Sequence, residues 1–311
     1  MEFKHVPIML QECIDGLNIN PDGIYVDATL GGAGHSSEIA KRLSKNGTLI
    51  GIDKDATAIE VSRQRLSKFD CNVILVNDDY KNLLEILKEN NIEKIDGLLA
   101  DLGVSSYQLD EVSRGFSYSK DAPLDMRMNQ NQSLTAYTVV NTYSEKELLK
   151  ILYEYGEENF AKSIVRNILK ERSEKPIQTT GELVKIIEKS VPSKLLHKGG
   201  SVAKKTFQAI RIEVNSELEN LKSVLNDMID CLKPEGRLCI ITFHSLEDRL
   251  VKNCFSENST GCICPKSLPI CVCNHKPIIE LINKKPIIPS QNEIENNSRS
   301  TSSKLRIAKK L

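Results

Sequence analysis

The 311-residue chain has no tryptophan, and only 5% of its residues are aromatic. Its net charge is zero at neutral pH, because 42 Lys and Arg residues balance 42 Asp and Glu residues. No apolar run approaches the roughly 20 residues that a membrane helix needs, and no basic and then apolar signal pattern opens the sequence. These absences argue against a membrane protein, an exported protein and a protein that coats nucleic acid through bulk charge. We expect a cytoplasmic protein.

Nine cysteines, an odd number without a signal peptide, do not indicate a disulfide framework. Cys262 and Cys264, then Cys271 and Cys273 with His275 close by, resemble a metal cluster. In zinc knuckles, however, two to four residues usually separate the paired cysteines. We therefore expect a reduced cysteine loop without a metal, and structural zinc is the alternative.

Apolar strands alternate with amphipathic helices over the first third of the chain. This alternation is typical of βαβ units with a parallel sheet and right-handed crossovers. We expect strands over 24–28, 48–53, 73–76 and 95–101, and helices over 36–43, 55–67 and 80–89 between them.

Polar residues follow the predicted strands at the same end. Asp27, Asp53 and Asp101 close three of them, and Asn77 or Asp78 follows the remaining one. In open α/β sheets the ligand lies in the crevice at this carboxyl edge. Four polar strand ends at one edge therefore predict a site there.

A glycine-rich turn joins the first strand to the first helix. Gly31, Gly32 and Gly34 let backbone N–H groups approach a ligand closely, with the dipole of the following helix behind them. Asp53 lies where such folds hold the hydroxyl pair of a ribose. The pattern predicts a cofactor that resembles a nucleotide.

The alternation stops after Asp101. An irregular, Ser- and Gly-rich stretch over 102–128 is typical of an ordered loop over a site. Helical patterns follow over 144–155, 159–172, 180–190 and 204–212, which indicates a helical insertion within an α/β domain.

The α/β pattern then resumes with a helix over 215–232, a turn signal at Lys233-Pro234-Glu235-Gly236 and a buried strand over 237–243. A cysteine-rich loop follows, and we expect residues 304–308 to form a strand at the edge of the sheet. The expected organisation is a first part of the α/β domain over 1–106, an all-helical insert over 107–212, and a second part of the α/β domain over 213–311.

Two cofactor classes fit the glycine turn. A dinucleotide fold uses Gly-x-Gly-x-x-Gly, but this chain has no third glycine at position 37, where close helix–strand packing under a pyrophosphate needs it. Asp27, four residues before Gly31, suits the ammonium group of an amino-acid tail. S-adenosylmethionine has such a tail and no phosphate, so it is favoured over a nicotinamide dinucleotide.

Several longer motifs resemble a known family. Asp101–Asp110, Arg114–Ser117, Pro123–Met128, Thr206–Leu218, Phe243–Arg249 and Arg299–Arg306 are similar to motifs of the RsmH/MraW family of bacterial methyltransferases. These enzymes modify the exocyclic N4 of a cytidine in small-subunit ribosomal RNA, and the resemblance covers essentially the whole chain. It implies a class I (Rossmann-like) S-adenosylmethionine-dependent methyltransferase sheet with an inserted all-helical domain.

The resemblance also implies which residues contact S-adenosylmethionine. Asp53 takes the ribose, Tyr80 lies against the adenine, and Asp101 and Gln108 close the methionine side. In the glycine turn the implied contacts are Ala33, Gly34 and His35.

Asp101 is the main candidate for catalysis. The cytosine N4 lone pair is delocalised, so an acceptor beside the amine and in-line placement are needed. Related amino-methyltransferases carry Asp/Asn-Pro-Pro-aromatic after the fourth strand, whereas this chain has Asp101-Leu102-Gly103-Val104. We hypothesise that Asp101 or a nearby carbonyl accepts from N4–H and that Tyr107 or Phe116 stacks on the flipped base. His244, just past the fifth strand, is a second candidate for the target side.

Lys204, Lys205 and Arg211 are candidate phosphate contacts at the end of the insert. The predicted partner is small-subunit ribosomal RNA or the assembled small subunit, with the oligomeric state open. Two alternatives to the methyltransferase are a nicotinamide-dependent oxidoreductase and a non-catalytic RNA-binding factor for ribosome assembly.

Overall fold

The computed structural model describes residues 7–196, 201–262, 264, 272, 273 and 275–311. The chain forms two compact units. One comprises Met1–Gly103 and Leu218–Leu311, and the other comprises Val104–Glu217. The insertion thus begins three residues before and ends five residues after the expected range of 107–212. No helix in the described part of the chain is long and apolar enough to cross a membrane.

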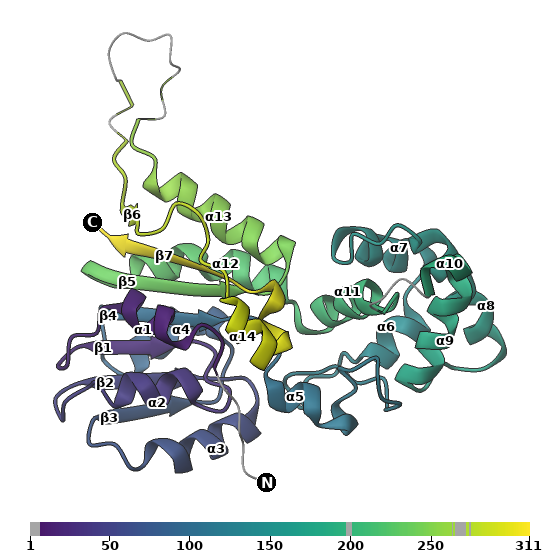
Figure 1. Ribbon diagram of the computed structural model, residues 1–311, viewed down its shortest axis with the longest axis horizontal. Coiled ribbons are helices and arrows are strands. Elements are labelled where there is room, and N and C mark those ends of the chain that lie inside the picture. The colour runs from purple at the N-terminus through teal and green to yellow at the C-terminus, as the bar shows by residue number, and fades with distance from the viewer. Residues whose placement is uncertain (1–6, 197–200, 263, 265–271, 274) are drawn as a thin grey trace. The chain divides into compact units, whose positions relative to one another are not determined.

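The first unit contains a seven-stranded sheet in the order β3-β2-β1-β4-β5-β7-β6 (Figure 1). Neighbouring strands from β3 to β5 run parallel, and β7 runs antiparallel to both of its neighbours. This confirms the predicted α/β class. The strands are β1 (Ile24–Asp27), β2 (Thr48–Ile52), β3 (Asn72–Val76), β4 (Ile95–Asp101), β5 (Leu232–Thr242), β6 (Ile279–Leu281) and β7 (Lys304–Lys310).

Helices cover both faces of this sheet (Figure 1). Successive side chains of a strand point to opposite faces, so Leu98 joins one apolar core and Leu99 the other. The core around Leu98 includes α4 (Leu83–Glu89), α12 (Glu217–Asp230) and α13 (Ser245–Ser259), and the core around Leu99 includes α1 (Leu10–Leu17), α2 (Gly34–Ala40) and α3 (Ala56–Leu66). The sequence pattern did not predict α1.

The turn signal at residues 233–236 is not a turn between elements. It lies inside β5, where three residues of β4, from Ile95 to Gly97, face six residues of β5, from Leu232 to Arg237. The extra residues form a bulge, and Glu235 takes a left-handed conformation with φ of 68°. Pro and Gly within a strand are tolerated at such a bulge. For this reason the Pro and Gly at residues 233–236 wrongly indicated a turn between a helix and a strand.

The closing strand is not at an edge. Strand β7 lies between β5 and β6 and pairs with both. A short strand at Ile279–Leu281 covers its outer side, a contact between segments that no local pattern reveals. Two short elements precede β7, namely α14 (Gln291–Asn296) and the 3₁₀ helix η3 (Ser298–Ser302).

The second unit is helical. Its elements are α5 (Ser106–Asp110), η2 (Val112–Arg114), α6 (Ala136–Thr142), α7 (Glu145–Glu154), α8 (Ala161–Glu174), α9 (Thr180–Ser190), α10 (Ser193–Leu196) and α11 (Lys204–Asn215). The apolar faces of α6, α7, α8, α9 and α11 share one core that includes Ile151, Ile164, Leu183 and Ile210. Capping boxes fix where α7 and α9 begin, through Ser144 with Glu147 and through Thr179 with Glu182, respectively.

Candidate active site

The glycine turn after β1 is held in place by Asp53. The Asp53 Oδ2 atom accepts a hydrogen bond from the Gly31 N–H at 2.8 Å, and Oδ1 accepts one from the Asp55 N–H at 2.8 Å. Gly31 has a positive φ of 49°, which glycine adopts without strain. Ala33 also takes a left-handed φ, of 57°, immediately before α2 begins at Gly34. Asp53, which follows β2, is thus hydrogen-bonded directly to the glycine turn that was predicted to form the cofactor site with it.

Position 34 has no room for a side chain. A Cβ atom at this position would overlap the Pro7 ring. Any larger residue at this position would therefore displace either Pro7 or the start of α2.

Asp27 has a structural role in the same turn. It is buried, its Oδ2 accepts a hydrogen bond from Ser36 Oγ at 2.6 Å, and its Oδ1 accepts one from the Thr29 N–H at 3.2 Å. Burial raises its pKa to about 6, and the hydrogen bonds from Ser36 and Thr29 oppose this shift. Binding of an ammonium group by Asp27 stays a prediction.

Asp101 ends β4 beside this turn. Its backbone N–H donates to Thr29 Oγ1 at 2.6 Å, and its Oδ2 lies 3.8 Å from His35 Nδ1. The other carboxylate oxygen, Oδ1, is buried and accepts no hydrogen bond from any described residue. Burial raises the pKa of Asp101 well above its usual range, and the charges of Asp27 and Glu247 raise it further. A buried acceptor of this kind is costly unless a donor or a cation reaches it.

His35 is neutral at physiological pH, because burial lowers its pKa to about 4. Its Nε2 lies 3.0 Å from the carbonyl oxygen of Ile8, which can only accept, so Nε2 carries the proton. Nδ1, which faces Asp101, is then an acceptor. His35 is thus held in a fixed orientation by the chain preceding α1, and it does not neutralise the Asp101 carboxylate.

Asp53 and Tyr80 lie along the same edge of the sheet. Burial raises the pKa of Asp53 to about 6, against the lowering effect of the Asp55 and Gly31 hydrogen bonds. The Asp53 N–H donates to the Val76 carbonyl at the end of β3. Tyr80 begins the 3₁₀ helix η1 (Tyr80–Asn82) a few residues further on and is partly buried against the core. The edge predicted from strand ends therefore brings Ala33, Gly34, His35, Asp53 and Asp101 together, with Tyr80 next to β3.

His244 is the N-cap of α13. The Glu247 N–H donates to His244 Nδ1 at 3.4 Å, and Glu247 Oε2 accepts from the Phe243 N–H at 2.8 Å. His244 Nε2 lies 3.1 Å from Glu247 Oε1. The structure thus gives His244 a structural function at a helix start, which favours a capping role over a role at the target base.

Gln108, Tyr107 and Phe116 belong to the helical unit. Gln108 is buried and forms a capping box with Ser105, its Oε1 accepting from the Ser105 N–H at 3.1 Å. Phe116 packs in the core of the helical unit, so stacking on a base is not available to it as it lies here. Tyr107 is only partly buried, which favours it over Phe116 as the aromatic that stacks on the target base.

The three candidate phosphate contacts differ in their surroundings. Lys204 and Lys205 are exposed at the start of α11, and Lys205 Nζ donates to the Glu157 carbonyl at 2.8 Å. Arg211 instead forms a two-point ion pair with Glu217, with both N–O distances at 2.9 Å. Because this pair satisfies the Arg211 guanidinium within the unit, the lysines are the stronger candidates for phosphate contacts.

Some motif residues that carry the family resemblance form hydrogen bonds between segments that are far apart in the sequence. Asp248 accepts from Arg306 Nε at 2.7 Å and from Lys304 Nζ at 3.0 Å, which joins α13 to β7. In the helical unit, Asn215 donates to the Met126 carbonyl and accepts from the Met128 N–H, each at 2.8 Å.

Three residues near the site were missed by the sequence reasoning. They are Thr29, Ser36 and Glu247, which hold Asp101, Asp27 and the start of α13, respectively. Only Glu247 had a readable signal, since it follows His244 at the capping-box spacing.

S-adenosylmethionine fits the groups at this edge. It has an ammonium and a sulfonium cation. The edge offers a buried Asp101 oxygen that has no donor among the described residues, and the charge of a second buried acid, Asp27, acts on Asp101. It also has a ribose, and Asp53 lies beside the glycine turn where that group is held. The electrostatics of this end of the sheet thus favour a cationic cofactor over a pyrophosphate.

The sheet order with an antiparallel β7, together with this acidic carboxyl edge, places the chain among the class I S-adenosylmethionine-dependent methyltransferases. The family model described as the MraW methylase family matches residues 2–311. The ribosomal RNA small subunit methyltransferase H of Clostridium botulinum (strain Kyoto / Type A2) is 58% identical over 311 residues, which cover 100% of both chains. The protein of the same name from Clostridioides difficile (strain 630) is 55% identical, again with 100% of both chains covered. This chain belongs to the MraW methylase family.

Family membership decides between the two cofactor classes that fitted the glycine turn. A methylase requires a methyl donor, so the cofactor is S-adenosylmethionine and the nicotinamide-dependent oxidoreductase is not favoured.

Proposed function

We propose that this enzyme transfers the methyl group of S-adenosylmethionine to the exocyclic N4 of one cytidine in small-subunit ribosomal RNA. Asp101 carries the proposal, because its buried Oδ1 accepts no hydrogen bond from the described residues and an exocyclic amine is a donor. The names of the curated relatives, which match over the full length of the chain, support ribosomal RNA of the small subunit as the substrate.

Cofactor binding is assigned to the carboxyl edge. The glycine turn contacts the methionine and ribose portions of S-adenosylmethionine through Ala33, Gly34 and His35. Asp53 accepts hydrogen bonds from the ribose hydroxyls. Tyr80 lies against the adenine. Gln108 is a further contact that the family resemblance implies, and Asp101 closes the methionine side.

The reaction needs an acceptor for one proton. When bound, the cofactor supplies an electrophilic methyl on a sulfonium, so the N4–carbon bond forms as the carbon–sulfur bond breaks and the sulfur becomes neutral. Asp101 accepts a hydrogen bond from N4–H, which directs the nitrogen lone pair toward the methyl, and then takes the proton that the methylated amine releases. Burial and the charges of Asp27 and Glu247 raise the pKa of Asp101, which makes its carboxylate a stronger base than an exposed aspartate.

Base mapping tests this function. In ribosomal RNA from cells that lack the gene, mass spectrometry should find one small-subunit cytidine without its N4-methyl group, and the gene should restore it. An unchanged modification pattern would contradict the proposed substrate. Cofactor binding without turnover on naked ribosomal RNA and on assembled subunits would instead support the non-catalytic assembly factor.

Lys204 and Lys205 are proposed to contact RNA phosphates. Replacing both with alanine should weaken RNA binding and reduce the slope of log affinity against log salt by about 1.4 to 1.8, as expected for two lost phosphate contacts. Salt titrations with a labelled RNA fragment measure the slope, and affinity for S-adenosylhomocysteine should not change. The matched control replaces Lys162 and Lys170, which are exposed on α8, and should leave the slope as in the unmodified protein. Equal slopes for both double variants would contradict the assignment.

A further inference from the structure

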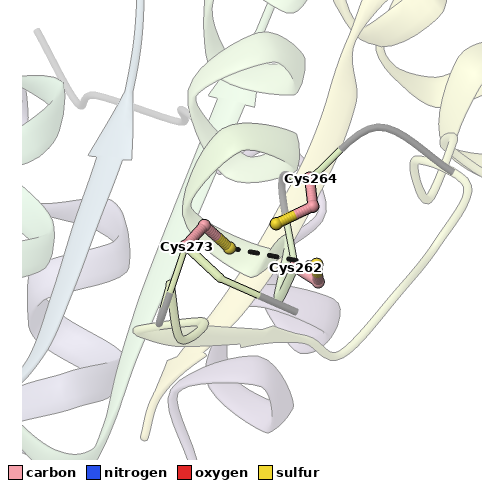
Figure 2. Close-up of side chains that lie close together, drawn as sticks. All are labelled: Cys262, Cys264 and Cys273. Carbon is pink, nitrogen blue, oxygen red and sulfur yellow. Dashed lines mark hydrogen bonds between the residues drawn. The ribbon is translucent and has the colours of Figure 1, made fainter. Parts of the chain in front are cut away.

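Three thiols converge in the loop between α13 and β6. Cys262, Cys264 and Cys273 come from two short segments of this loop, and their sulfur atoms all lie within 4.8 Å of one another. Figure 2 shows the three side chains directed toward a common point. The Sγ atoms of Cys262 and Cys273 are 3.9 Å apart. None of these three cysteines is among the residues assigned above to methyl transfer.

The spacing of the sulfur atoms matches a tetrahedral thiolate site. Zinc–sulfur bonds are about 2.3 Å long, so two thiolates on one tetrahedral zinc are separated by about 3.8 Å. The distance of 3.9 Å between Cys262 and Cys273 is within about 0.1 Å of that value. A disulfide instead requires a sulfur–sulfur distance of about 2.05 Å.

The number of thiols also favours a metal. A disulfide uses two sulfur atoms and leaves the third unexplained, whereas a zinc site uses all three. The Val272 N–H points at Cys264 Sγ at a distance of 3.4 Å, and such a donor stabilises a thiolate bound to a metal. The short spacing of Cys262 and Cys264 had argued against zinc. However, the sulfur atoms of Cys262 and Cys264 lie within 4.8 Å of one another, so this spacing lets both reach one ion.

We propose that Cys262, Cys264 and Cys273 bind one structural Zn²⁺ through their thiolates. The structure assigns these three ligands, and Cys271, which the sequence offers as a fourth thiol, lies outside the described residues. The ion closes the loop between Ser259, where α13 ends, and Ile279, where β6 begins. Its role is to fix this connection, because metal ligands that close a loop remove conformational freedom from the chain.

Metal analysis tests the proposal on the full-length protein. Protein purified without added zinc should contain about one Zn²⁺ per chain by elemental mass spectrometry. Each of the variants Cys262→Ser, Cys264→Ser and Cys273→Ser should lose most of it. The matched control is Cys71→Ser, a buried cysteine before β3, which should keep the full zinc content.

Two further measurements keep the test independent of folding defects. Protein reconstituted with Co²⁺ should show the absorption bands of a tetrahedral cobalt–thiolate site. Removal of the metal by a chelator should speed proteolysis between residues 260 and 276 while affinity for S-adenosylhomocysteine is retained. Absence of bound zinc together with no cobalt–thiolate bands would overturn the proposal, as would a Cys262–Cys273 disulfide in the freshly purified protein.

Discussion

Asp101→Asn should lower the rate of methyl transfer by at least about 100-fold, the lower limit of what a positioned general base contributes. Asparagine has nearly the shape of aspartate but cannot take up the proton that the methylated amine releases. Affinity for S-adenosylhomocysteine should change far less, because the amide oxygen can still accept hydrogen bonds. Single-turnover rates on small subunits that lack the modification, compared with calorimetric binding, separate the two effects.

The sign of the stability change caused by Asp101→Asn can be predicted. Because burial and the charges of Asp27 and Glu247 raise the pKa of Asp101, ionising it in the folded protein is unfavourable. The neutral amide removes that cost, so the variant should be at least as stable as the unmodified protein at pH 8. Asp70→Asn, at an exposed site before β3, is the matched control and should keep the full rate. A full methylation rate in Asp101→Asn would exclude Asp101 as the proton acceptor.

Asp53→Ala should weaken binding of S-adenosylhomocysteine about 100-fold. Hydrogen bonds to a charged group contribute roughly 1.5–3 kcal/mol each, and the variant loses the carboxylate that accepts from the ribose. It also leaves the Gly31 N–H without its acceptor, so the glycine turn loses the bond that fixes it. Isothermal titration calorimetry measures the dissociation constant directly.

The same interaction should depend on pH. Burial raises the pKa of Asp53 to about 6, so its carboxylate is ionised above that pH and becomes protonated as the pH falls through it. Affinity of the unmodified protein should therefore fall between pH 8 and pH 5, and its advantage over Asp53→Ala should shrink over the same range. Asp70→Ala serves as the control for the loss of one acidic side chain. A constant ratio of the two dissociation constants would show that Asp53 does not bind cofactor as a carboxylate.

Much of the α/β unit could be predicted because its signals are local. Strands β1 to β4 and the helices between them follow from apolar periodicity, which depends on neighbours within one element. The parallel arrangement then places the ends of those strands at one edge, so Asp53 and Asp101 could be predicted to lie at that edge before any contact was known. The missing third glycine also pointed to the right cofactor class.

Other features depend on segments far apart in the chain. Residues 304–310 have the pattern of any short strand, and only pairing with both β5 and β6 places this strand inside the sheet. His244 has the side chain of a catalytic base, but its neighbour Glu247 gives it a capping function. Phe116 occurs in an aromatic loop motif, and only the packed helical unit shows that it is buried.

The sequence by itself determined the order of the α/β elements, the acidic edge and the family motifs, because these depend on local periodicity and residue identity. The tertiary structure decided which of these polar groups have partners. Asp27 is satisfied by Ser36, Arg211 by Glu217, and Asp101 retains one buried oxygen without a donor among the described residues. It also brought together three thiols whose spacing along the chain did not favour a metal. The reason is physical, since desolvation and hydrogen bonding depend on distances in space that only the packed chain sets.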